Sequence, residues 1–157
     1  CLRPATVSGF SERLRLDLTV NKLTFDAFYK KKIFVDGGSQ IRPTVNLKDI
    51  IRVVDHFLFT RKKFKHNIYN MGFENLSIIQ VAKRIQKKIS AKLVLKKKID
   101  IRSYRQDSSR LIKTGFKPKF KIDDSIDELI LHFNQKKLNQ FGINNYNLMK
   151  MKKLNVR

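Results

Sequence analysis

The chain has 157 residues, of which 41% are apolar, and 35 Lys and Arg against 13 Asp and Glu leave a net charge of +22. This length fits one domain or one lobe of a larger protein, and the apolar fraction is enough for a core. There is no run of 18 apolar residues, which excludes a membrane-spanning helix. The single cysteine, Cys1, excludes an internal disulfide framework and, with no signal-peptide pattern, predicts a reducing, cytoplasmic location.

The positive charge comes mostly from short lysine runs. Residues 61–98 carry 12 Lys and Arg against one acid. Such runs beside apolar residues are typical of solvated helix faces and loop edges. A nucleic-acid-binding module is kept as an alternative function, although Phe64 is the one aromatic residue inside the basic run 61–65.

The first 35 residues predict a strand, a helix and a second strand. A short β-branched strand is expected at Leu2–Val7. Apolar residues at helical spacing predict a helix from Leu16 that ends at the lysines 30–32, where cations suit the negative pole. Ile33–Val35 predicts the second strand.

The stretch Asp36–Asp49 combines a turn, a strand and a helix start. Gly37-Gly38 indicates the turn, and Asn46, three residues before Asp49, predicts a cap for the next helix. Between them, Arg42 lies on a short strand. A guanidinium held there suits a phosphate or carboxylate, and a surface arginine or a structural salt bridge is the alternative.

In the second half of the chain, predicted helices and strands again alternate. Helices are expected after Asp49, after a Ser77–Gln80 capping box, after an Asp107 cap and after Asp123, with strands at 67–72 and 93–95. This predicts an α/β fold: the end of a parallel sheet plus a small mixed lobe. From Gln135 the sequence is rich in Asn and Lys, which predicts a loosely attached tail.

The residues by themselves indicate no catalytic group and no metal site. The three histidines have no metal-ligand spacing, and there is neither a Gly-rich phosphate loop nor a Ser/His/Asp set. Arginines beside turns are the remaining candidates for anion binding.

Three blocks in register resemble the NAD-dependent nucleotide-sugar epimerases and dehydratases of the extended short-chain dehydrogenase family. The first is Leu2-Arg3-Pro4-Ala5-Thr6-Val7-Ser8-Gly9. The second is matched by Gly38, Gln40, Arg42, Pro43, Val45, Leu47 and Asp49. The third is matched by Asp100, Arg102, Tyr104, Asp107, Ser109, Arg110, Leu111, Gly115, Phe116 and Pro118.

The resemblance implies roles for particular residues. In the family, the arginines at Arg42 and Arg102 contact the nucleotide diphosphate. The position of Thr6 borders the sugar nucleotide, and the helix start at Asp17 and Leu18 lies against the nucleotide, with Asn21 a further substrate candidate. A carboxylate at Asp17 would repel a phosphate, so its side chain is expected to point elsewhere. The positions of Pro4 and Ala5 lie near the nicotinamide.

The family's Gly-rich dinucleotide loop and catalytic Tyr-x-x-x-Lys pair precede the strand at Leu2. The resemblance therefore implies a fragment whose N-terminal part is missing. Residues 1–134 would be the C-terminal, sugar-nucleotide-binding portion, with the end of a Rossmann-type parallel sheet, and 135–157 a basic tail. NAD or NADP would be bound mainly by the missing part, and the fragment alone would be inactive. The family also implies a homodimer of the full-length protein, and a non-catalytic relative is a further alternative.

Overall fold

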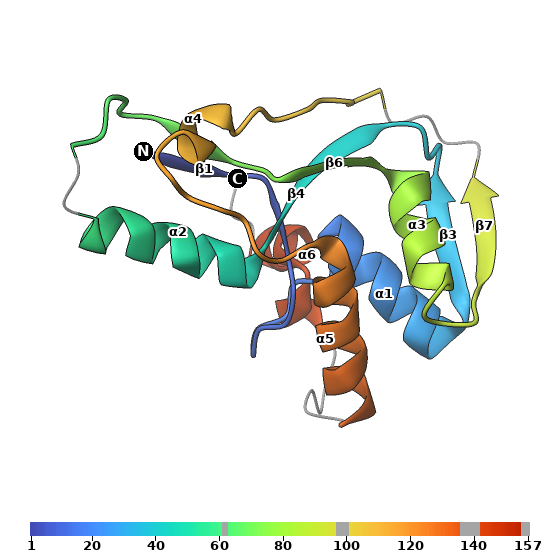
Figure 1. Ribbon diagram of the computed structural model, residues 1–157. Coiled ribbons are helices and arrows are strands. Elements are labelled where there is room, and N and C mark those ends of the chain that lie inside the picture. Colours follow the sequence, from blue (N-terminus) through green and yellow to red (C-terminus); the bar gives the residue numbers. More distant parts are fainter. Residues whose placement is uncertain (61–62, 97–100, 136–141, 155–157) are drawn as a thin grey trace.

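The computed structural model describes residues 1–60, 63–96, 101–135 and 142–154, and these form an α/β fold, as predicted (Figure 1). The strands are β1 (Leu2–Pro4), β2 (Thr6–Ser8), β3 (Lys32–Asp36), β4 (Ile41–Asn46), β5 (Tyr69–Met71), β6 (Glu74–Ser77) and β7 (Lys92–Lys96). The helices are α1 (Thr19–Lys30), α2 (Leu47–Phe59), α3 (Ile78–Gln86), α4 (Ser109–Ile112), α5 (Ile122–Asn134) and α6 (Asn147–Lys153), with a 3-10 turn, η1, at Ile143–Asn145. None of the helices described is long and apolar enough to cross a membrane.

The strands of the described residues form three small sheets. β1 pairs with β5 and β3 with β7, both in parallel, while β4 lies between a parallel β2 and an antiparallel β6. The strand expected at Leu2–Val7 is divided at Ala5, whose amide donates to the carbonyl of Met71 at 2.9 Å. This break lets one extended stretch serve two sheets. β6 was not predicted because it is short and polar, and its pairing with β4 makes it a strand.

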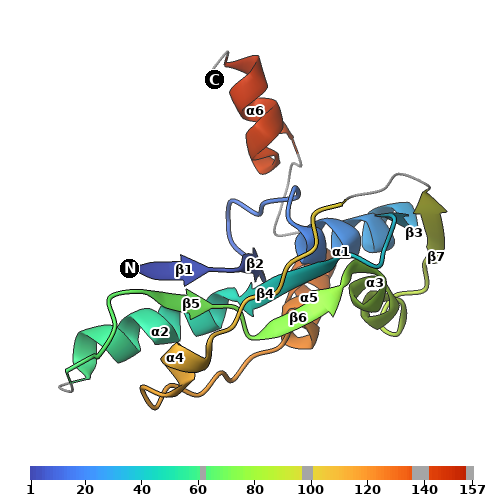
Figure 2. The ribbon, with the colours of Figure 1, turned by 90° about the horizontal axis from the view of Figure 1, so that it is seen from above.

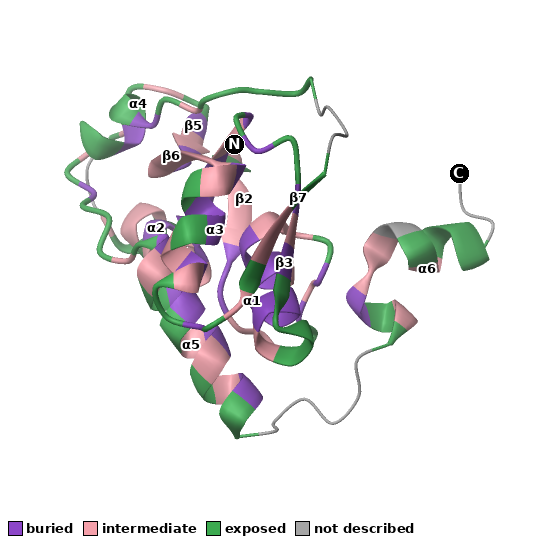
Figure 3. Ribbon diagram, turned by 90° about the vertical axis from the view of Figure 1, so that its right-hand side faces the viewer, coloured by how far each residue is buried: buried purple, intermediate pink, exposed green. Residues whose placement is uncertain are grey.

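The main core lies where α1, α3, α5 and β3 meet. It includes Val20, Leu23 and Ala27 of α1, which helical spacing places on one face, and Ile126 of α5. Figure 3 shows the buried segments gathered where these elements face one another. In a second cluster, Leu14 and Leu16, which precede α1, pack against apolar side chains of α1 and α5. A third cluster lies beside α2 and β5.

One helix boundary differs from the sequence prediction. α1 begins at Thr19 rather than Leu16, because the amide of Leu16 donates to the carbonyl of Asn145 and its side chain enters the second cluster. The helix that the Asn46 cap predicts is present as α2. Its Val53 is buried but its Leu58 is 70% exposed, so only part of its apolar surface is packed.

The predicted caps of α2 and α3 are confirmed, whereas the N-cap residue of α4 is Ser108, and Asp107, the residue before it, binds the first amide of that helix. Asn46 accepts a hydrogen bond from the amide of Lys48 at 2.8 Å and begins α2. Ser77 and Gln80 form both hydrogen bonds of a capping box at α3. Asp107 accepts from the amide of Ser109 at 2.8 Å before α4. Each cap satisfies amides that a helix start leaves without an intrahelical partner.

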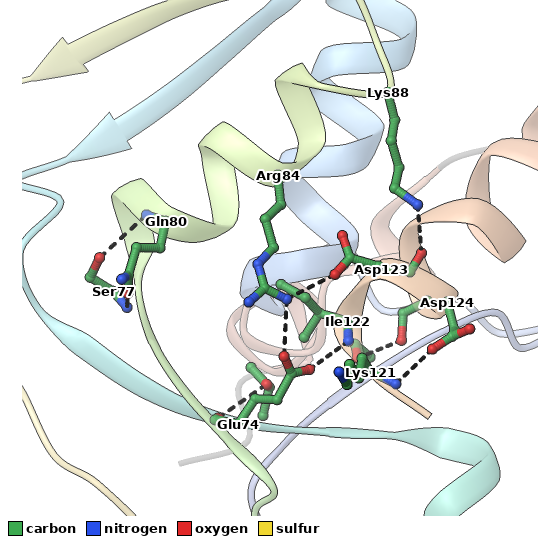
Figure 4. Close-up of polar contacts among 12 residues, drawn as sticks. Glu74, Ser77, Gln80, Arg84, Lys88, Lys121, Ile122, Asp123 and Asp124 are labelled. Atoms are coloured by element: carbon green, nitrogen blue, oxygen red, sulfur yellow. Dashed lines mark hydrogen bonds and ion pairs between the residues drawn. The ribbon is translucent and has the colours of Figure 1, made fainter. Parts of the chain in front are cut away.

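A polar network fastens α5 to β6 and α3 (Figure 4). Glu74 accepts from the amide of Ile122 at 2.6 Å and from Arg84 at 3.0 Å. Arg84 also donates to Asp123 at 2.8 Å, in the first turn of α5. These contacts position α5 across the core, and the sequence showed no sign of them because the partners are 10 to 48 residues apart.

The chain after Gln135 is not loosely attached throughout. Asn145 is only 6% exposed, and Tyr146 packs against the second cluster. The hydrophobic pattern did not predict that this segment packs against the rest of the chain. The contact depends on hydrogen bonds between Asn145 and a loop distant in sequence more than on an apolar helix face.

Candidate functional site

A pocket of about 400 Å³ lies between the start of α1, the end of β3, the start of β4 and the segment around Arg102. Five of the residues predicted to contact a sugar nucleotide line it. The full lining is Thr6, Asp17, Leu18, Thr19, Lys22, Leu23, Phe34, Asp36, Gln40, Arg42, Ile78, Arg102 and Tyr104. Its volume is within the range of small-ligand sites.

Arg42 and Arg102 meet at this pocket although 60 residues separate them. Arg42 Nη1 donates to the carbonyl of Arg102 and, at 3.1 Å, to that of Ile41. The amide of Tyr104 donates to the Ile41 carbonyl at 3.2 Å, and the Arg42 guanidinium lies 5.2 Å from the Tyr104 ring centroid. The extended segment around Arg102 therefore runs beside the start of β4.

The Gly37-Gly38 turn is held rigidly against the pocket. Both glycines have positive φ values, 71° and 117°, which side chains with a Cβ rarely adopt. Gln40 is 8% exposed; its Oε1 accepts from the Gly38 amide and its Nε2 donates to the Asp36 carbonyl, both at 2.6 Å. This clamp places Arg42 two residues further along a fixed strand.

The start of α1 forms the opposite wall. Leu18 is its N-cap residue, no side chain caps the helix, and no acid lies in its first turn. The positive pole of α1 is therefore not neutralised by its own first turn. Asp17 lies just outside it, and its two carboxylate oxygens accept from Arg15 Nε at 3.0 Å and Nη2 at 3.1 Å.

The pairing with Arg15 sets the ionisation of Asp17. Partial burial raises the pKa of this carboxyl, but the hydrogen bonds and charge of Arg15, with the amide of Asn147, outweigh burial and hold the pKa below its ordinary value. Asp17 is thus a paired carboxylate on the wall of a pocket whose other charged lining residues are Lys22, Arg42, Arg102 and Asp36.

Asp17 should make folding stability depend on acidity. Because its pKa is lowered in the folded chain, its contribution is present above the ordinary carboxyl value and is lost as the pH falls through the folded value. Asp17→Asn should therefore lose less thermal stability than the wild type between pH 6 and pH 3. We expect a difference of at most about 1 kcal/mol, since the pair is partly exposed. Arg15→Gln should reduce the loss of stability on acidification by a similar amount. If both variants lose as much stability as the wild type, the pairing of Asp17 with Arg15 does not account for the acid dependence.

The other predicted site residues lie in different places. Thr6 lines the pocket from β2, in register with Thr44 of β4. Asn21 is buried and is not among the pocket's lining residues; it accepts from the amide of Gly9 and donates to the carbonyl of Arg15, both at 3.2 Å. Pro4 ends β1 and Ala5 follows it, so both are in the strand that leads to Thr6, and neither lines the pocket.

Sequence reasoning missed several lining residues. Gln40 and Tyr104 belong to the blocks that resemble the family, but no role was predicted for them. Each lies two residues from a predicted arginine, and in an extended chain this spacing places two side chains on the same face. Phe34 gave no signal beyond its place in a strand. Tyr146 and Lys150 have Tyr-x-x-x-Lys spacing, but neither lines this pocket, and Tyr146 packs against the second cluster.

No protein-family model matches the chain. Its fold matches part of TunA, an NAD-dependent NDP-hexosamine 5,6-dehydratase involved in tunicamycin biosynthesis, with a TM-score of 0.72 and 20% identity over 88% of this chain and 46% of that one. UDP-glucuronic acid 4-epimerase from Bacillus cereus, in complex with UDP-glucuronic acid and NAD, matches with a TM-score of 0.68 and 23% identity over 85% and 44%. UDP-glucose 4-epimerase from Thermotoga maritima, with UDP-glucose, matches with a TM-score of 0.69 and 20% identity over 85% and 45%. The chain thus shares the fold of part of these enzymes and spans less than half the length of each.

Proposed function

We propose that residues 1–134 are the sugar-nucleotide-binding portion of an NAD(P)-dependent epimerase or dehydratase. The observation that carries this proposal is the meeting of Arg42 and Arg102 on one wall of a pocket that faces the start of α1. The likeness of the fold to structures of nucleotide-sugar enzymes supports it.

The chemistry of the two walls suits a diphosphate. A guanidinium offers a planar fork of donors that matches phosphate oxygens in pairs. A helix start offers amide donors and the positive end of the macrodipole. With Arg42 and Arg102 on one side and Leu18 and Thr19 on the other, the phosphates would lie between guanidinium groups and helix amides.

The rest of the pocket suits a nucleoside. Phe34 and Tyr104 provide aromatic surface, on which a base can stack. Thr6, at the β2 side, would then border the sugar. Asp17 would stay paired with Arg15, which removes the repulsion that an unpaired carboxylate would exert on the phosphates.

The bound NAD would supply hydride transfer at the sugar ring. Of the residues present, Pro4 and Ala5 would border the nicotinamide, while the remaining cofactor contacts and the proton-transferring group would come from outside this chain. The 157 residues would accordingly bind the substrate without converting it.

A calorimetric titration of the chain with UDP, UMP and uridine tests this proposal. UDP should bind about tenfold or more tightly than UMP, since a second phosphate adds charge-assisted hydrogen bonds of about 1.5–3 kcal/mol each. Incubation with NAD and UDP-glucose should give no product. A single-stranded oligonucleotide separates the nucleic-acid alternative, because its affinity falls steeply with salt. Binding of the oligonucleotide with no measurable UDP affinity would favour that alternative.

A further inference from the structure

The segment Gly142–Asn147 docks on the loop Arg13–Asp17, which leads into the pocket wall. Figure 2 shows this loop reaching out from β2 toward the chain that precedes α6. The Asn145 carbonyl accepts from the Leu16 amide at 2.8 Å, and Asn145 Nδ2 donates to the Leu14 carbonyl at 2.8 Å. Asn145 thus pairs with the Leu16 amide and the Leu14 carbonyl, much as a residue of a neighbouring strand would.

Asn145 is built into this contact rather than resting on the surface. It is 6% exposed, and its Oδ1 accepts from the Gly142 amide at 2.9 Å. Both side-chain polar atoms and the carbonyl are therefore hydrogen-bonded. Because a buried polar group that loses its partner is costly, this arrangement specifies one docked geometry.

Asn147 continues the contact to the pocket itself. Its amide donates to Asp17 Oδ2 at 3.1 Å, and its Oδ1 accepts from Arg13 Nη2 at 2.7 Å. Asp17 is a lining residue, and the next residue, Leu18, begins α1. One side of Asp17 thus faces the pocket while its carboxylate is held by Arg15 and by the C-terminal segment.

We propose that residues 142–147 act as a latch for the nucleotide pocket, with Asn145 as its positioning residue. Docking of the latch would fix the loop that carries Asp17 and Leu18, and would keep the Asp17 carboxylate turned away from the phosphates. The inference rests on the proposed function, since the ligand that favours the docked state is the nucleoside diphosphate.

The latch makes a reciprocal prediction. If the pocket binds UDP better when the segment is docked, UDP must favour docking by the same factor. Hydrogen exchange of the Leu16 and Asn147 amides reports docking directly, because both donate across this contact. UDP should slow their exchange more than that of the Ile122 amide, which donates to Glu74 and does not line the pocket, because general stabilisation by a ligand would slow all three amides alike.

The test compares Asn145→Ala with Asn70→Ala in the 157-residue chain. Asn70 Nδ2 also donates to a backbone carbonyl, that of Asp107 at 3.0 Å, but Asn70 does not line this pocket. Asn145→Ala should weaken UDP binding about tenfold, and Asn70→Ala less than about twofold. If Asn145→Ala fails to fold, Asn147→Ala, which removes the contact to Arg13 without changing charge, should weaken binding about two- to fivefold.

The outcomes separate the two proposals. A wild type that does not bind UDP overturns the proposed function and the latch together. A wild type that binds UDP, with unchanged affinity in the latch variants and no slowing of exchange at Leu16 and Asn147, overturns the latch alone. Loss of affinity in the latch variants, with slowed exchange in the wild type, supports it.

Discussion

Arg42→Ala should weaken UDP binding by about 1.5–3 kcal/mol, or roughly ten- to hundredfold. The guanidinium bridges the start of β4 and the Arg102 segment, so its loss removes a phosphate donor and loosens the wall that carries Arg102. Arg42→Lys should fall between the wild type and alanine, because an ammonium keeps the charge but not the planar fork. Isothermal titration calorimetry with UDP gives the values.

Arg110→Ala is the matched control for this experiment. It removes the same charge from α4, and Arg110 does not line the pocket. Its UDP affinity should stay within about twofold of the wild type, because an exposed charge that makes no contact with the ligand acts on it only through water and salt, which screen it. An equal loss in Arg42→Ala and Arg110→Ala would mean that net charge, and not the pocket, holds the nucleotide.

Asp49→Ala should lower the free energy of unfolding by about 3–5 kcal/mol. Asp49 is fully buried in the first turn of α2 and accepts from the amides of Lys119 and Phe120 at 3.0 and 2.9 Å. Arg52 also donates to it, at 2.5 Å. Removing the carboxylate leaves the Lys119 and Phe120 amides without this acceptor, while Arg52 keeps only the Lys117 carbonyl, so the segment that leads into α5 is held less firmly.

Urea denaturation followed by circular dichroism measures this loss. Asp49→Asn keeps one acceptor oxygen and should cost less than alanine. Asp55→Ala, at an exposed position of the same helix, should change the free energy of unfolding by no more than about 0.5 kcal/mol. Equal effects at Asp49 and Asp55 would show that the buried contacts of Asp49 contribute little.

Asp49 illustrates what pattern matching conveys and what it omits. The sequence placed it in the block that also contains Arg42, and predicted that the helix would begin at Asn46. It did not reveal that Asp49 binds the chain 70 residues later. A motif can therefore hold residues with structural roles beside residues that line the pocket, and spacing alone does not distinguish them.

Asn21 and Asn145 are two asparagines whose roles the sequence did not predict correctly. The family resemblance made Asn21 a candidate for substrate contact, yet both the oxygen and the nitrogen of its side-chain amide bind the backbone. Asn145 lies in a stretch that composition marked as a tail, yet it is one of the buried polar residues. Burial of an asparagine depends on whether distant backbone groups can pair with it, which local sequence does not encode.

The sequence by itself determined the local structure of this protein. Apolar spacing, glycine turns and side-chain caps predicted most of the helices and strands, because these signals act over a few neighbouring residues. Tertiary structure decided which segments meet: the division of the first strand between two sheets, the pairing of Arg42 with the Arg102 carbonyl, and the docking of Asn145 on the pocket loop. The last two contacts join residues 60 and 131 positions apart, so they arise only when the packed core brings the backbones together.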